Sequence, residues 1–143
     1  MTAEQIHRLR KSFRLLEQKA DSAAPLFYQQ LFTLDPGLRP LFKTDIELQA
    51  MKLMKMLRGA LDLLDRQPEE LEDTLHDLGT RYSEYGIRPR HYASVGTALT
   101  AMLEKSLGGD FTLETRQAWV ALYHLIAATM LNGAARATFS SAA

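Results

Sequence analysis

The sequence contains no cysteine, and this absence removes several kinds of chemistry at once. Without thiols, the chain can form no disulfide, no cysteine-ligated zinc or iron–sulfur site and no thiolate nucleophile. Covalent attachment of haem through a Cys-x-x-Cys-His motif is excluded for the same reason. Histidine, carboxylate and phenol side chains are left as potential metal ligands.

An excess of charge of one sign is also lacking, because 17 basic and 17 acidic side chains cancel. We therefore predict neither nucleic acid nor an anionic membrane as a partner. The N-terminal segment is polar from Glu4 to Lys11, and no apolar run approaches the roughly 18 to 20 residues of a membrane span. We expect a soluble cytoplasmic protein, and the sequence does not determine its oligomeric state.

No segment alternates apolar and polar residues with the period of two that is typical of a β-strand, so the expected fold class is all-α. The 143 residues are enough for one domain that, as helices, folds around one medium-sized ligand. This domain is expected to cover residues 1–133, and the Ala/Ser-rich end over residues 134–143 is expected to fray.

Helix boundaries are indicated by capping residues and by apolar residues three and four positions apart. Thr2 with Gln5, and Thr44 with Glu47, each form a capping box pattern, and the pair Asp21-Ser22 is expected to cap the second helix with Pro25 in its first turn. The expected helices cover residues 2–20, 21–34, 35–42, 44–64, 68–85, 89–107 and 112–131.

Tyr82 lies near the end of one of these helices. Leu75, Leu78 and Tyr82 share one helical face, and Gly86 supplies a left-handed cap just past the helix end. Considered alone, this pattern describes a capped helix with a packed core tyrosine.

Three stretches carry a further pattern that spans nearly the whole chain. They are the aromatic and apolar residues 26–42, the segment 49–53 and the stretch 78–96. With Trp119 and Tyr123 on the last helix, they resemble the bacterial single-domain globins and the haem domain of flavohaemoglobins. Order, spacing and residue type agree from the first helix to about Leu131.

The resemblance implies the globin fold, a sandwich of helices around non-covalently bound haem b. The ligand at the iron would be oxygen, nitric oxide or another small diatomic or anionic molecule. Tyr28 and Gln49 match the family's distal tyrosine and glutamine, and Leu53 follows one turn after Gln49. Bound oxygen acquires partial superoxide character, which phenol O–H and amide N–H groups stabilise. Such a pocket would retain its ligand tightly and suits oxygen binding or transport.

Further contacts with the haem are implied by the same resemblance. Phe42 is expected to stack on the porphyrin. Lys52 is placed to reach a haem propionate, with a solvated lysine as the alternative. The complete set of implied cofactor contacts is Phe42, Gln49, Lys52, Leu53, Leu57, Leu78, Arg81, Tyr82, Ile87, Tyr92 and Val95.

Tyr82 departs from the family pattern, which reads Leu-Gly-x-x-His with the histidine as the proximal iron ligand. We predict that the Tyr82 phenolate binds the iron instead. A phenolate is a hard anion that favours ferric iron and lowers its reduction potential. Arg81 would help the phenol to ionise, although consecutive helical residues point about 100° apart, so that a direct contact is not assured.

Other residues compete only weakly for the role of iron ligand. His76, His91 and His124 are expected to be surface or hydrogen-bonded histidines, and Tyr85 is expected to pack. Reactive haem domains of the family also place a glutamate on the last helix, where this chain has Ala134. This residue weakens the case for peroxidase chemistry.

Three hypotheses follow from the sequence. The first is a haem-binding globin with Tyr82 as ligand to mainly ferric iron. The second is nitric oxide dioxygenation or peroxide turnover, with electrons from a separate reductase because the chain has no dinucleotide-binding fingerprint. The third is a globin-fold sensing module in which haem binding is weak or lost.

Overall fold

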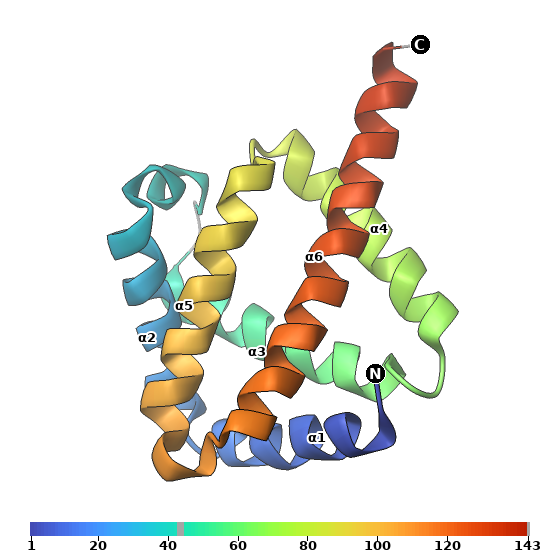
Figure 1. The fold of residues 1–143 in the computed structure, drawn as a ribbon. Coiled ribbons are helices and arrows are strands. Elements are labelled where there is room, and N and C mark those ends of the chain that lie inside the picture. The colour runs from blue at the N-terminus through green and yellow to red at the C-terminus, as the bar shows by residue number, and fades with distance from the viewer. Residues whose placement is uncertain (43–44, 143) are drawn as a thin grey trace.

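The computed structural model describes residues 1–42 and 45–142, with side chains up to Arg136. The described residues form α-helices and short 3₁₀ helices and contain no strand, which confirms the all-α prediction (Figure 1). In chain order the elements are α1 (Ala3–Glu17), α2 (Ala20–Leu34), η1 (Pro36–Leu41), α3 (Ile46–Leu63), α4 (Pro68–Glu84), α5 (Pro89–Leu107), η2 (Gly108–Asp110) and α6 (Leu113–Ala142).

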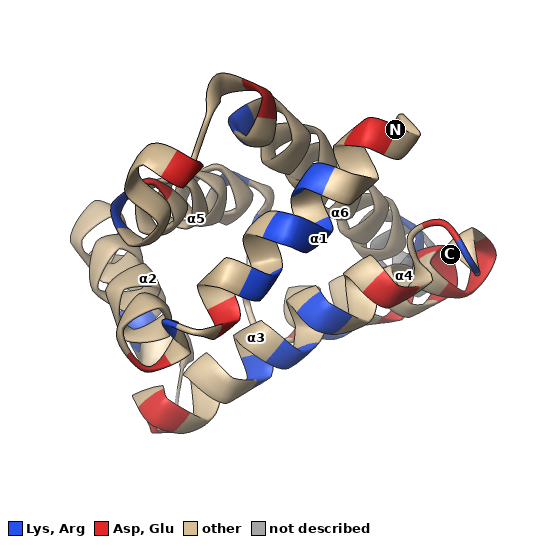
Figure 2. Ribbon diagram, turned by 90° about the horizontal axis from the view of Figure 1, so that it is seen from below, with Lys and Arg blue, Asp and Glu red and all other residues tan. Residues whose placement is uncertain are grey.

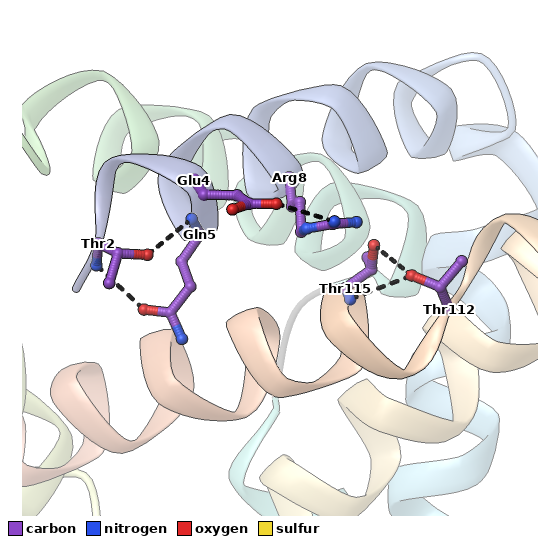
Figure 3. A network of polar contacts seen from close by, with 6 residues as sticks. All are labelled: Thr2, Glu4, Gln5, Arg8, Thr112 and Thr115. Atoms are coloured by element: carbon purple, nitrogen blue, oxygen red, sulfur yellow. Dashed lines mark hydrogen bonds and ion pairs between the residues drawn. The ribbon is translucent and has the colours of Figure 1, made fainter.

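The first helix begins at the hydroxyl cap that the sequence indicates, and the last helix begins at a second hydroxyl cap (Figure 3). Thr2 and Gln5 form a reciprocal capping box, with both hydrogen bonds 3.1 Å long. At the start of α6, the Thr115 N–H donates to Thr112 Oγ1 at 3.2 Å. These bonds satisfy backbone donors that have no partner inside the helix.

Two other predicted helix starts differ in the structure. α2 begins at Ala20 after an N-cap at Lys19, so Asp21 and Ser22 lie in its first turn and Pro25 lies inside the helix. The Lys19 carbonyl accepts the first helical bond, from the Ala23 N–H at 2.8 Å, and this bond moves the start upstream. The predicted cap Thr44 of the fourth element lies outside the described residues.

α3, which corresponds to this predicted helix, has Asp45 as its N-cap. Its carboxylate accepts a hydrogen bond from the Glu47 N–H at 3.4 Å. The remaining predicted boundaries agree closely with α1, η1, α4 and α5. α6 continues to Ala142, and fraying of residues 134–143 stays a prediction.

α6 is the central helix and packs against α1, α4 and α5. Its Trp119 is buried, and the indole Nε1–H donates to Ser12 Oγ on α1 at 2.8 Å. Over Leu113–Arg136, α6 is long and apolar enough to cross a membrane by length and composition, contrary to the expectation that no such run exists. Buried Leu122, Ile126 and other side chains show it here as the core helix of a globular fold.

α4 and α6 cross with almost no space between their backbones. A Cβ atom on Gly79 would lie 2.0 Å from the Met130 carbonyl oxygen, and one on Gly133 would lie 2.2 Å from the His76 carbonyl oxygen. Thr80 Oγ1 lies at the same crossing, 3.1 Å from the Gly133 carbonyl oxygen to which it donates. The crossing therefore fixes the position of α4, including Tyr82 one turn beyond Gly79.

Charged side chains connect α1 to α3 on the outer surface. In Figure 2, Lys and Arg residues follow both helices, and acidic residues gather at the start of α4. Arg10 pairs with Asp65 at 2.6 Å and also donates to the Leu61 carbonyl at 2.9 Å, while Arg58 pairs with Glu17. Such exposed pairs contribute little free energy, so the buried apolar contacts dominate the packing.

Gly79→Ala is expected to destabilise the fold, because the new methyl group would overlap the Met130 carbonyl oxygen. Overpacking against a rigid backbone lowers the free energy of unfolding by about 1–3 kcal/mol or more. Gly59→Ala is the matched control, since no atom lies within 4 Å of its Cβ position and alanine favours a helix. Urea unfolding measures both variants, and equal stabilities would contradict the close crossing.

Candidate functional site

Three tyrosines on three helices are linked electrostatically, since Tyr82 influences both of the others. Tyr28 lies on α2, Tyr82 on α4 and Tyr92 on α5. Burial raises the pKa of each hydroxyl, and the charge that Tyr82 would carry on ionisation raises the pKa of both Tyr28 and Tyr92. This mutual influence places the Tyr82 hydroxyl within electrostatic reach of the other two phenols.

Tyr82 occupies the last turn of α4. Gly86, with φ of 97°, ends the turn as predicted, and the Ile87 N–H donates to the Tyr82 carbonyl at 2.9 Å. The Tyr82 residue is 38 % exposed, so it is not the packed core tyrosine that the local pattern describes. Arg81 lowers the pKa of this hydroxyl, an effect that opposes the larger effect of burial.

The Tyr28 side chain is held on the opposite side by α3 and by a group of aromatic rings. Its hydroxyl donates to the main-chain carbonyl of Gln49 at 3.0 Å. The rings of Phe27, Phe32 and Phe42 surround it, with centroid distances of 4.9, 6.0 and 5.8 Å. A new acceptor in the pocket would therefore receive this proton only after the hydroxyl rotates away from the Gln49 carbonyl.

The other predicted site residues divide into buried or half-buried apolar side chains and more exposed polar ones. Leu57 is fully buried, whereas a set of apolar side chains is half-buried and packed against the core: Phe42, Leu53, Leu78, Ile87, Tyr92 and Val95. Gln49 is half-buried, and Lys52 and Arg81 are exposed at the edge. Apolar side chains, phenols and two exposed cations are the kinds of group that would contact a flat apolar macrocycle carrying a metal ion and anionic substituents.

The histidines have other partners or positions. His91 is buried at 3 % exposure, its Nδ1 accepts from the Arg88 N–H at 2.8 Å, and its Nε2 lies 4.0 Å from Asp35 Oδ2. His124 is exposed. Within the described residues no group of three His, Asp or Glu side chains is placed to hold a metal.

Tyr85 corrects one sequence expectation. It was predicted to pack, but it is 68 % exposed, because the residue lies at the C-cap just beyond α4. Tyr82 is therefore the less exposed of the two phenols in this segment.

The sequence did not indicate one contact, which lies between α5 and α6. The Tyr123 hydroxyl on α6 donates to the Tyr92 carbonyl, and the Tyr123 ring lies against Gly96 of α5. Gly96 stands among larger residues on this face of α5, and a glycine inside a helix is a sequence signal for such a close contact.

A sequence profile of the globin family matches residues 26–130. The chain belongs to the globin family. Members of this family bind haem and small gas ligands such as oxygen. Neuroglobin of Chaenocephalus aceratus is 31% identical to this globin over 142 residues, which cover 90% of this chain and 89% of that relative.

Solved structures share the fold of this globin. An engineered carbene transferase from Rhodothermus marinus has a TM-score of 0.87 at 23% identity, covering 100% of this chain and 99% of that one. A bacterial globin from Campylobacter jejuni has a TM-score of 0.81 at 20% identity, with coverage of 94% and 97%. A flavohaemoglobin from Malassezia yamatoensis has a TM-score of 0.76 at 18% identity, covering 95% of this chain and 37% of its own. The predicted globin fold is confirmed.

The raised pKa values predict alkaline destabilisation of the haem-free protein. Burial raises the pKa of Tyr28, Tyr82, Tyr92 and Tyr123 above the ordinary value of 10.0. Above about pH 10 the unfolded chain loses these protons before the native state does, so the free energy of unfolding falls as pH rises through the native pKa values. Urea unfolding across this range, with ultraviolet absorbance to follow tyrosine ionisation, measures the effect.

Tyr82→Phe removes one of these groups and its influence on two others. In this variant the ionisation of Tyr28 and Tyr92 should move to lower pH. An unchanged titration of the remaining tyrosines would show that Tyr82 does not share their pocket.

Proposed function

We propose that this globin binds haem b non-covalently, with the Tyr82 phenolate as proximal ligand to a mainly ferric iron. The observation that carries the proposal is the position of Tyr82 in the last turn of α4, within electrostatic reach of Tyr28 and Tyr92, while His91 has other partners. The residue also stands three positions after Gly79, where the family pattern has histidine.

The surroundings of Tyr82 support a fixed ligand position. The α4–α6 crossing at Gly79 and Gly133 holds the helix, and the Ile87 N–H holds the Tyr82 carbonyl. Bound haem iron would supply a Lewis acid that favours the ionised phenol despite its raised pKa. Arg81 acts in the same direction, since it lowers the pKa of this hydroxyl.

On the other side of the pocket, Tyr28, Gln49 and Leu53 would receive a small diatomic or anionic ligand. Tyr28 is positioned by the Gln49 carbonyl and by neighbouring rings, so its hydroxyl reaches a new acceptor by rotation rather than by movement of the helix. The half-buried Leu53 adds an apolar surface one turn after Gln49. Oxygen, nitric oxide and small anions all present an acceptor atom to such donors.

Ligand binding is favoured over peroxide turnover by a residue on α6. Ala134 stands where reactive haem domains of the family place a carboxylate, and a methyl group can neither donate nor accept a hydrogen bond. Nitric oxide dioxygenation would additionally require a separate reductase. Oxygen transport, a cytoplasmic location and a sensing role stay predictions.

Exchange of Tyr82 tests the proposal through the absorption spectrum of the haem-loaded protein. As isolated, the protein should show a high-spin ferric spectrum with a phenolate charge-transfer band, which Tyr82→Phe abolishes. Tyr82→His should allow reduction by dithionite and ferrous oxygen binding, because a neutral imidazole binds both oxidation states.

Tyr85→Phe is the matched control, since it removes an exposed phenol three residues away. It should leave the spectrum unchanged. If the purified protein takes up no haem, or if Tyr82→Phe retains the charge-transfer band, the proposal is wrong.

A further inference from the structure

An open groove of about 540 Å³ lies between α5 and α6. Small or apolar side chains such as Thr97, Val120 and Ala127 line it. Glu104 and Arg116, 3.8 Å apart, lie at its edge and cancel each other's charge. His124 is the remaining basic residue of the lining, so the groove has no large excess of charge of either sign and can admit neutral molecules.

A smaller cavity of about 40 Å³ lies inside the helices, and every side chain that lines it is aliphatic, aromatic or methionine. Three of them, Leu53, Leu57 and Val95, belong to the haem-contact set. A cavity needs about 10 to 15 Å³ of such volume to hold one water molecule, so a diatomic molecule has room here. Because the lining offers few polar partners, an apolar guest is favoured over water or an ion.

Leu99, Trp119 and Tyr123 line both spaces and thus form the partition between them. Leu99 and Trp119 are buried, and Trp119 is additionally bonded to Ser12. Tyr123 is half-buried, and its hydroxyl is held by the Tyr92 carbonyl. Its ring lies against Gly96, where a Cβ atom would be 2.8 Å from Cε2, so glycine provides the room for this ring.

We propose that small neutral molecules pass from the α5–α6 groove to the haem pocket through the inner cavity, with Tyr123 as the gate. The class of ligand is apolar and has one or two heavy atoms, as in oxygen, nitric oxide, carbon monoxide or xenon. Rotation of the Tyr123 ring away from Gly96 joins the two spaces. The route serves the proposed ligand-binding function but does not depend on Tyr82 as the iron ligand.

Carbon monoxide rebinding after flash photolysis tests the gate in the haem-loaded Tyr82→His protein reduced with dithionite, because the phenolate of the unchanged protein favours ferric iron. Tyr123→Phe keeps the ring and removes the hydrogen bond to Tyr92. Loss of one such bond makes the open position roughly two- to tenfold more frequent, so the association rate constant should rise by a similar factor.

Substitutions on α6 test the outer part of the route. Ala127→Phe places a ring in the groove and should slow association severalfold. Ala128→Phe is the matched control, because Ala128 is exposed on the same helix but does not line the groove. The control should leave the rate unchanged.

Xenon exchange followed by nuclear magnetic resonance of the same variants supplies a readout that needs no chemistry at the iron. The exchange rate should rise in Tyr123→Phe and fall in Ala127→Phe. If xenon follows this pattern and carbon monoxide does not bind, the route stands and the proposed ligand function fails. If neither probe responds to Tyr123→Phe or Ala127→Phe, molecules enter elsewhere and the route is wrong.

Discussion

The contact between α4 and α6 is the constraint on which the site depends. Gly79 and Gly133 bring the two backbones so close that neither position has space for a methyl group. Thr80 adds a hydrogen bond across the crossing. Because α6 is itself fixed to α1 through Trp119 and Ser12, the position of α4 is determined by the core. The side chain one turn beyond the crossing is Tyr82, and its place in the pocket follows from this packing.

The pocket combines apolar walls with phenols whose ionisation is suppressed. Burial raises the pKa of Tyr28, Tyr82 and Tyr92, so each stays a neutral donor at physiological pH in the haem-free protein. Only a strong local cation would lower the pKa of one of these tyrosines enough to ionise it at physiological pH. Tyr82 is the tyrosine best placed to ionise beside such a cation, because Arg81 already lowers its pKa. The Tyr28 hydroxyl is instead bonded to the Gln49 carbonyl. This difference supports the proposal of Tyr82, and not Tyr28, as the iron ligand.

Sequence patterns predicted the helices well because caps and apolar spacing are local. The Thr2–Gln5 box and the Gly86 turn follow from short-range chemistry, and the globin fold follows from the family resemblance. The haem contacts, Phe42 among them, stay predictions. Sequence patterns did not predict the features that depend on tertiary contacts. Exposure of Tyr85, the carbonyl acceptor of Tyr28 and the glycine contacts of α4, α5 and α6 depend on how helices distant in sequence approach one another. The long apolar stretch of α6 also escaped notice, since scattered polar residues conceal it in a simple search for runs.

The central claim is that the Tyr82 phenolate binds haem iron, and resonance Raman spectroscopy of the ferric haem-loaded protein tests it most directly. The protein would be prepared with ordinary and with ring-deuterated tyrosine. The account predicts phenolate vibrations that shift on deuteration and disappear in Tyr82→Phe. Absence of any deuterium-sensitive vibration, or its persistence in Tyr82→Phe, would contradict the account.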